Sequence, residues 1–167
     1  MSQRAVFDCM VFLQAAMRAT GPAAACFRLV DAGHVELCIS AESLTEVQEV
    51  LCRPSLQRRY KSLSPENVEK FLAEVARKTT LVSGAASVFS YPRDPKDELY
   101  VDLAAAARAR YLVTRDRDLL DLMNDDTPEG KDFRQRFPDL MIVDPVSFLE
   151  QFLPKKGDDD SAQPNAS

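Results

Sequence analysis

The order of apolar and polar positions along the chain alternates between two kinds of segment. Short apolar runs predict strands, and longer segments whose apolar residues recur three or four positions apart predict helices. The expected strands are residues 5–7, 36–39, 81–82, 111–114 and 141–143. The expected helices are residues 9–17, 40–51, 64–78, 94–110, 118–123 and 145–153, with a loop at 124–130. Strands that alternate with helices predict an α/β fold, a sandwich around a mostly parallel central sheet.

The chain is long enough for one domain with a sizeable core. It has 167 residues, of which 46% are hydrophobic, and it contains no internal repeat. We expect residues 1–153 to form this single domain. The remaining segment, 154–167, reads PKKGDDDSAQPNAS, and its polar composition predicts a disordered tail.

The net charge leaves an anionic substrate possible. It is −5, and three of the negative charges are the consecutive aspartates at 158–160. The rest of the chain is only about two units negative, so cations that gather locally can still attract an anion. The basic clusters are Arg53, Arg58, Arg59 and Lys61; Arg115 and Arg117; and Lys131, Arg134 and Arg136. Each cluster is also compatible with an ordinary solvated surface.

Cysteine and histidine usage argues against several kinds of site. Four cysteines are widely spaced in apolar segments without a Cys-x-x-Cys pair: Cys9, Cys26, Cys38 and Cys52. We expect them to be reduced core residues, and neither a disulfide framework nor a zinc site. His34 is the only histidine, so a histidine-based triad or metal site is not expected. No signal peptide or membrane-spanning segment is predicted, and we expect a cytoplasmic protein with no membrane partner.

Four acids lie where an α/β sheet usually binds its ligands. Asp8 directly follows the first expected strand, and Asp116 follows the strand at 111–114. Asp97 lies in the first turn of helix 94–110, and Glu46 borders the apolar face of helix 40–51. In open α/β sheets, ligands bind at the carboxyl ends of the strands. The four acids are therefore expected at one edge of the sheet.

Structural explanations for these acids stay open. A strand-end aspartate commonly caps the next helix, and Asp144 has the same strand–Asp–helix form with no chemical use. Glu46 has two possible positions. With Ser43 as N-cap it completes a capping box, whereas with Ser40 as N-cap it lies well inside the helix, four residues after Glu42. A single acid of this kind therefore does not identify a site.

The four acids taken together point to a metal ion. Carboxylates brought within a few ångströms of one another repel and raise each other's pKa unless a cation compensates. Hard oxygen ligands without cysteine or histidine suit Mg²⁺ or Mn²⁺. Metal ions of this kind can activate water and stabilise a leaving oxygen, which predicts hydrolysis of phosphodiesters.

Three blocks of the sequence form a pattern when taken in order: VFDCMVFL, ISAESLTEVQEVLCRP and DPKDELYVDLAAAARARYLVTRDRDLLDL. In this order they resemble PIN-domain proteins, and most of all the VapC-like toxins of bacterial toxin–antitoxin pairs. The last block is the most specific, because D-x-x-D is followed by an alanine-rich helix, an apolar strand and T-x-D-x-D-L-L. The resemblance spans roughly residues 4 to 150.

The resemblance implies a three-layer α/β/α fold that acts as a metal-dependent endoribonuclease on single-stranded RNA, with Mg²⁺ or Mn²⁺. It also implies a small antitoxin partner and a homodimer. The residues carried over are Asp8, Glu46, Asp97 and Asp116 for catalysis and metal binding, Asp118 for metal binding, and Thr114, Glu42 and Glu98 as auxiliary residues. Arg115, Arg117 and Arg53 are expected to contact RNA through phosphates, which carry no sequence information.

One departure from the family pattern lies in the first motif. The family usually has Asp-Thr-Asn there, whereas this chain has Asp8, Cys9 and Met10. Met10 cannot supply the hydrogen bonds of asparagine, which predicts a less firmly oriented metal site. A second hypothesis is therefore a PIN-like module that binds RNA or a protein without cutting. A haloacid dehalogenase-type phosphatase would need aspartate at position 10, and a receiver domain would need lysine where Asp144 stands, so both are set aside.

Overall fold

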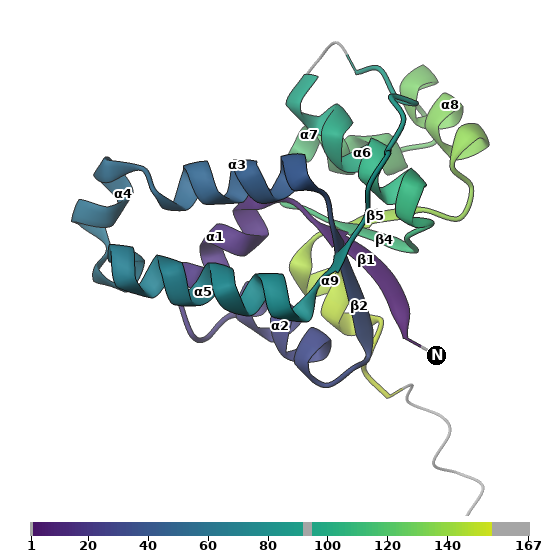
Figure 1. The fold of residues 1–167 in the computed structure, drawn as a ribbon. Coiled ribbons are helices and arrows are strands. Elements are labelled where there is room, and N and C mark those ends of the chain that lie inside the picture. Colours follow the sequence, from purple (N-terminus) through teal and green to yellow (C-terminus); the bar gives the residue numbers. More distant parts are fainter. Residues whose placement is uncertain (1, 92–94, 155–167) are drawn as a thin grey trace, which may run out of the picture.

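The computed structural model describes residues 2–91 and 95–154, and within them five strands form one parallel sheet (Figure 1). The strands are β1 Gln3–Phe7, β2 Val35–Ile39, β3 Thr80–Leu81, β4 Tyr111–Val113 and β5 Met141–Val143. Their order is β3-β2-β1-β4-β5, and every neighbouring pair is parallel. The chain thus builds outward from β1 on one side, then crosses over to build the other side. This change of direction leaves a crevice between the carboxyl ends of β1 and β4, where α/β proteins bind ligands.

Helices cover both faces of the sheet. On one face lie α1 Cys9–Met17, α2 Pro22–Asp31, α3 Ala41–Leu51, α4 Pro54–Arg59, α5 Pro65–Lys78 and α9 Pro145–Glu150. On the other lie α6 Pro95–Ala107, α7 Arg117–Leu120 and α8 Pro128–Arg136. Single 3-10 turns, η1 Lys61–Leu63 and η2 Asp121–Met123, complete the connections. The expected three-layer α/β/α sandwich is therefore confirmed.

Alternation along the central strands explains the two cores. Ala5 and Phe7 of β1 pack into the cluster with α1, α2 and α9, whereas Val6 between them packs into the cluster with α6 and α8. In β4, Tyr111 and Val113 face the first cluster, and Leu112 faces the second. Successive strand residues point to opposite faces, so strands buried on both sides read as continuous apolar runs.

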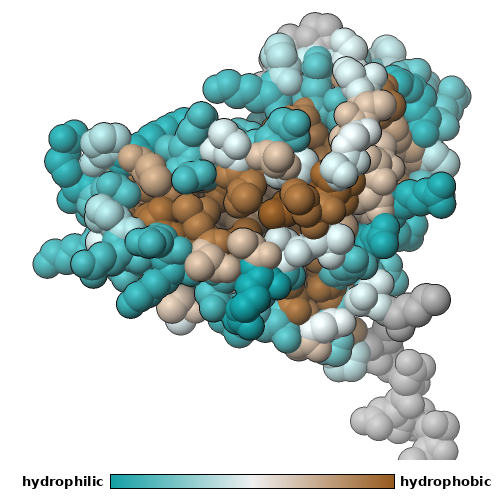
Figure 2. All heavy atoms as spheres, in the orientation of Figure 1, coloured by the Kyte–Doolittle hydropathy of each residue, from teal (hydrophilic) through white to brown (hydrophobic). Residues whose placement is uncertain are grey.

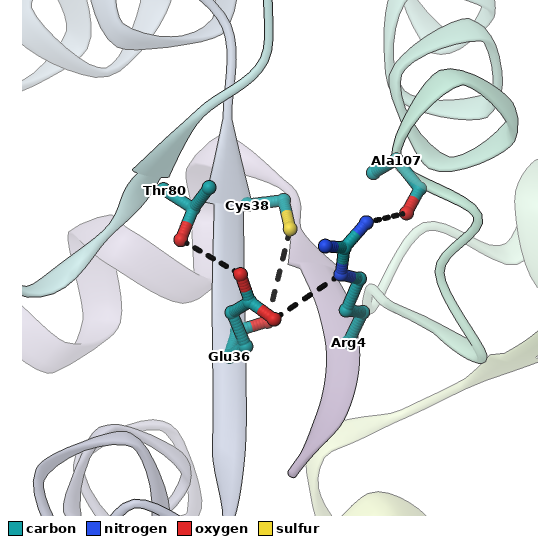
Figure 3. A network of polar contacts seen from close by, with 5 residues as sticks. All are labelled: Arg4, Glu36, Cys38, Thr80 and Ala107. Carbon is teal, nitrogen blue, oxygen red and sulfur yellow. Dashed lines mark hydrogen bonds and ion pairs between the residues drawn. The ribbon is translucent and has the colours of Figure 1, made fainter. Parts of the chain in front are cut away.

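A polar network on the α6 face ties three strands to one helix (Figure 3). Arg4 of β1 donates from Nε to Glu36 of β2 at 3.1 Å and from Nη1 to the Ala107 carbonyl, at the end of α6, at 3.0 Å. The other Glu36 oxygen accepts a hydrogen bond from Thr80 of β3 at 3.0 Å. The network fixes the carboxyl-terminal end of α6 against the sheet, which helps to place the residues of its first turns.

Several sequence expectations need correction. The expected loop 124–130 ends early, because Thr127 caps α8 with its side chain and Pro128 occupies the first helical position. Helices α2 and α4 were not predicted at all, although each begins with proline in the same way. Cys52 is exposed at the end of α3 and is not a core residue, although all four cysteines are free as expected. Of the expected tail, only Pro154 lies within the described residues, and Asp94, the first residue of the expected helix 94–110, lies outside them.

One face of the molecule carries an apolar region. Figure 2 shows hydrophobic side chains gathered on the face between α3 and α5. α3 carries the partly buried Leu44, α5 carries the partly buried Leu72, and Leu81 of β3 is 64% exposed. In the described part of the chain, no helix is both long and apolar enough to cross a membrane.

Candidate active site

Asp8 directly follows β1, at the mouth of the crevice between β1 and β4. Its Oδ1 accepts a hydrogen bond from the Val11 backbone N–H at 3.1 Å, so it caps α1. Its Oδ2 accepts a hydrogen bond from the Thr114 hydroxyl, directly after β4. The side chain is only 5% exposed, and burial raises its pKa from 3.8 to about 6, with a smaller contribution from the charge of Asp116. Asp8 is thus both a helix cap and a buried carboxylate whose charged form is disfavoured by its burial.

The residues after β4 form a compact turn around Thr114. The Thr114 hydroxyl donates to Asp8 and accepts a hydrogen bond from the Asp116 backbone N–H at 3.0 Å. Asp116 in turn caps α7, because its Oδ1 accepts from the Asp118 backbone N–H at 2.8 Å. The turn therefore holds Asp116 beside Asp8 through a fully buried threonine.

The position of Glu46 is settled by the capping of α3. Ser40 is the N-cap, and Ser40 and Ser43 bond reciprocally to each other's backbone N–H groups at 3.1 and 2.9 Å. Glu46 therefore lies inside the helix, as one of the two expected alternatives required. Its Oε2 accepts a hydrogen bond from the Tyr100 hydroxyl at 2.8 Å, and its Oε1 accepts one from the Cys9 thiol at 3.4 Å. Both contacts aim the carboxylate toward α1 and α6.

Tyr100 is a site residue that the sequence analysis missed. Its hydroxyl donates to Glu46 and also accepts a hydrogen bond from the Cys9 backbone N–H at 3.1 Å, so it joins α6, α3 and α1. Burial raises the pKa of Tyr100 well above its usual range and that of Cys9 to about 12, so both groups stay protonated donors. The signal available was spacing, because Tyr100 follows Asp97 by three residues and so shares its face of α6.

A pocket of about 320 Å³ brings the expected catalytic acids together. All four line it: Asp8, Glu46, Asp97 and Asp116. Cys9, Tyr100, Met10 and Gln14 also line it, as do two cations, Lys96 and Arg115. Asp8 and Asp97 are nearly buried, whereas Glu46 and Asp116 are partly exposed. Four segments far apart in the sequence therefore place one carboxylate each around a single pocket.

Six other expected site residues are absent from the described lining of this pocket: Thr114, Asp118, Glu42, Glu98, Arg117 and Arg53. Thr114 still contacts the site, because its hydroxyl donates to Asp8. Glu98 instead accepts a hydrogen bond from the Tyr91 backbone N–H at 2.7 Å, which holds the segment before α6. Glu42 and Arg117 are exposed on their helices. Arg53 is the N-cap of α4, a helix at the left of Figure 1, whereas α6 and α7 lie at its upper right.

The donor chemistry of the pocket fits a hard divalent cation. It offers four carboxylates from separate segments and no imidazole, the set that Mg²⁺ and Mn²⁺ prefer. Burial raises the pKa of Asp8 to about 6, so the charged form of this carboxylate is disfavoured where it lies. As the side chains lie, no three His, Cys, Asp or Glu residues of the described chain are grouped closely enough to hold a metal ion. The ligands therefore match in type, whereas a bound ion would require the carboxylates to draw together.

Comparison with known proteins gives a family and a fold. A family model described as a PIN domain matches residues 4–118. A solved structure of VapBC2 from Rickettsia felis, bound to a DNA fragment from their promoter, contains a chain with a similar fold. The TM-score is 0.53 at 17% sequence identity, and the match covers 85% of this chain and 98% of the other. No curated protein matches the sequence.

Proposed function

Because this chain belongs to the PIN-domain family, we propose that it is a metal-dependent endoribonuclease that hydrolyses phosphodiester bonds of single-stranded RNA. PIN domains are in general nucleases, which supports a hydrolase. The observation that carries the proposal is the single pocket around which Asp8, Glu46, Asp97 and Asp116 converge. A neutral ligand would leave the charges of four carboxylates in one pocket uncompensated. A divalent cation would compensate them and could also bind a phosphate.

The four acids would hold Mg²⁺ or Mn²⁺, which supplies an activated water and stabilises the leaving oxygen when bound. The protein contributes orientation. Thr114 donates to Asp8 from one side, while Tyr100 and Cys9 donate to Glu46 from the other. Such supporting hydrogen bonds fix the direction of a ligand oxygen and are worth about 10–100-fold in metal affinity or activity in other metal sites.

Arg115 is the residue best placed to contact the substrate. Its exposed side chain lines the pocket beside Asp8 and Asp116. A guanidinium there can donate two parallel hydrogen bonds to one phosphate group and so hold the strand against the acids. Arg117 and Arg53, which lie outside the described lining, would act at most by attracting RNA over a longer range. Asp118 would influence the metal only through Asp116, because the Asp118 backbone N–H donates a hydrogen bond to the Asp116 carboxylate.

The test is cleavage of a labelled single-stranded RNA with Mn²⁺ or Mg²⁺, and again with excess chelator. Asp8→Asn and Asp116→Asn should abolish cleavage, because each removes a ligand charge but keeps a side chain that can cap its helix. Asp144→Asn is the matched control, because Asp144 caps α9 by accepting from the Ser147 N–H at 2.7 Å and does not line the pocket as described. Cleavage by folded Asp8→Asn protein at the native rate would refute the proposal.

A second candidate is a PIN-like module that binds RNA or protein without cutting. Met10 favours it, because it stands 44% exposed at the pocket where the family usually has asparagine. Lys96 also favours it, because an ammonium in the pocket can offset carboxylate charge in place of a metal. Tight RNA binding that is insensitive to chelator, with no cleavage under any metal, would support this candidate.

The proposal extends to the role of a toxin held by a small antitoxin protein. The fold shared with a chain of VapBC2 supports it, as does the apolar face between α3 and α5. Co-expression with a small neighbouring reading frame should yield a stable complex and suppress cleavage. A homodimer is also proposed, and light scattering of the purified chain would measure it. A monomer whose activity no neighbouring product suppresses would contradict both extensions.

A further inference from the structure

A second pocket of about 310 Å³ adjoins the acidic pocket. Gln14 and Arg115 line both, so the two cavities share one wall. The second pocket lies among α1, the start of α2 and the end of α4, and its other lining includes Arg18, Thr20 and Tyr60. The two pockets have opposite electrostatic character, because four acids line the first and no acid is part of the described lining of the second.

The two arginines of the second pocket are available to a ligand. Elsewhere in the described chain, arginines such as Arg4, Arg77 and Arg134 pair with carboxylates. Within the same described residues, neither Arg18 nor Arg115 has an ion-pair partner. These two positive charges lie beside a strongly acidic pocket and are not paired with its carboxylates. An extended anion that reaches into the second pocket would supply the missing negative charge.

An aromatic ring and an amide complete the lining. Tyr60 is partly buried, and Arg59 lies over its ring at 5.4 Å from the centroid. Aromatic rings in grooves that also carry positive charge are the usual platforms on which the bases of single strands stack. Gln14 Oε1 is a buried atom without a hydrogen-bond partner in the described structure, at the wall between the pockets. An amide there can bond to a base edge or a ribose hydroxyl.

We propose that the second pocket is a subsite for the nucleotide next to the scissile phosphate of a single-stranded RNA. Arg18 and Arg115 bind the phosphate of that nucleotide, and its base lies against Tyr60. This assignment rests on the ribonuclease proposed above and deepens it, since it gives the strand a path from the acids toward the start of α2. A strand lying across both pockets places one phosphate at the acids and the next in the basic pocket.

The test measures RNA binding separately from RNA cleavage. A fluorescent single-stranded RNA of about six nucleotides is titrated with the full chain in chelator, and anisotropy gives the Kd at several salt concentrations. Arg18→Gln should weaken binding several-fold and lower the slope of log Kd against log salt by about one, because one phosphate contact is lost. Tyr60→Leu should weaken binding about fivefold or more through lost stacking, with little change in the slope.

Arg58→Gln is the matched control. Arg58 is an exposed arginine of α4 without an ion-pair partner among the described residues, and it is not part of the described lining of the second pocket. Equal effects of Arg18→Gln and Arg58→Gln on affinity and slope would overturn the subsite. So would the absence of measurable RNA binding by the native chain. Circular dichroism checks the fold of each variant, and Arg18→Gln, at an exposed position, keeps the test informative where Tyr60→Leu fails to fold.

The same variants distinguish this subsite from the proposed activity. Loss of affinity in Arg18→Gln, together with a native chain that cleaves no RNA, would support nucleotide binding in the second pocket and refute the ribonuclease. If the native chain cleaves RNA and Arg18→Gln cleaves it with the same KM, the ribonuclease is supported and the subsite is overturned. Raised KM with nearly unchanged kcat in Arg18→Gln is the result expected when both hold.

Discussion

Asp8→Asn should stabilise the metal-free protein, and the gain should depend on pH. Asp8 is 5% exposed, and burial raises its pKa from 3.8 to about 6. Between about pH 4 and pH 6 the folded state therefore binds more protons than the unfolded state, so the free energy of unfolding falls as pH rises. A shift of roughly 2 units at 1.36 kcal/mol per unit gives a cost of about 3 kcal/mol above pH 6.

Asparagine removes that cost and keeps the cap, because its carbonyl oxygen can still accept from the Val11 N–H. The contact with Thr114 reverses, because the asparagine amide donates to the hydroxyl oxygen that now donates to Asp8. The variant should therefore match the native protein near pH 4 and exceed its free energy of unfolding by about 1–3 kcal/mol at pH 8. If Asp8 were only a helix cap, the substitution should change the free energy of unfolding little at any pH, because asparagine and aspartate are about equally good caps.

The assay is urea denaturation followed by circular dichroism at pH 4, 6 and 8 in chelator, with Asp144→Asn as the matched cap. Asp144→Asn should change stability by only a few tenths of a kcal/mol at each pH. Adding Mg²⁺ or Mn²⁺ at pH 8 should stabilise the native protein more than Asp8→Asn, because only the native site keeps the ligand charge. An Asp8→Asn protein that is destabilised at pH 8, or that follows Asp144→Asn at every pH, would refute this account of Asp8.

Three further results are expected. Tyr100→Phe should lower metal-dependent cleavage about 10–100-fold and raise the Mn²⁺ concentration required, because Glu46 loses its 2.8 Å hydrogen bond; unchanged metal dependence would contradict a positioning role. Gly130→Ala should destabilise the fold by 1–3 kcal/mol or more in urea denaturation, because a Cβ would lie 1.8 Å from the Asn124 carbonyl oxygen; a change of a few tenths would show that this backbone yields easily. Phe148→Ala should cost about 3–5 kcal/mol by the same assay, because its fully buried ring contacts three other aromatic rings; a smaller loss would indicate that the core collapses into the cavity.

Local signals in the sequence sufficed for most of the fold. The apolar run of β4 and the cap-and-proline start of α5 predicted those elements closely, because strand burial and capping each depend on a few neighbouring residues. The same chemistry was present at Thr127 and Pro128 and was read as a loop, since α8 carries few apolar residues and so gives little periodic signal. The position of Glu46 depended on which serine caps α3, and sequence spacing allowed both.

The part of the site that sequence could not give depends on packing between elements. Spacing within α6 places Tyr100 on the same helix face as Asp97, but its contacts with Cys9 and Glu46 exist only once α1, α3 and α6 meet. The sequence predicted the four acids at one edge of the sheet, but not that they line one pocket. That closer arrangement requires the order β3-β2-β1-β4-β5, which follows from long-range pairing and not from any one segment.

The choice between a helix cap and a metal ligand is not exclusive for Asp8. One carboxylate oxygen caps α1, and the other accepts from Thr114 across the crevice. Asp144 caps α9 in the same way, yet β5 is the last strand on its side of the described sheet, whereas β1 lies between β2 and β4. An aspartate after a central strand meets the ends of its neighbours, and one after an edge strand meets fewer. Position in the strand order, more than the local motif, therefore decides which strand-end carboxylates can form a site.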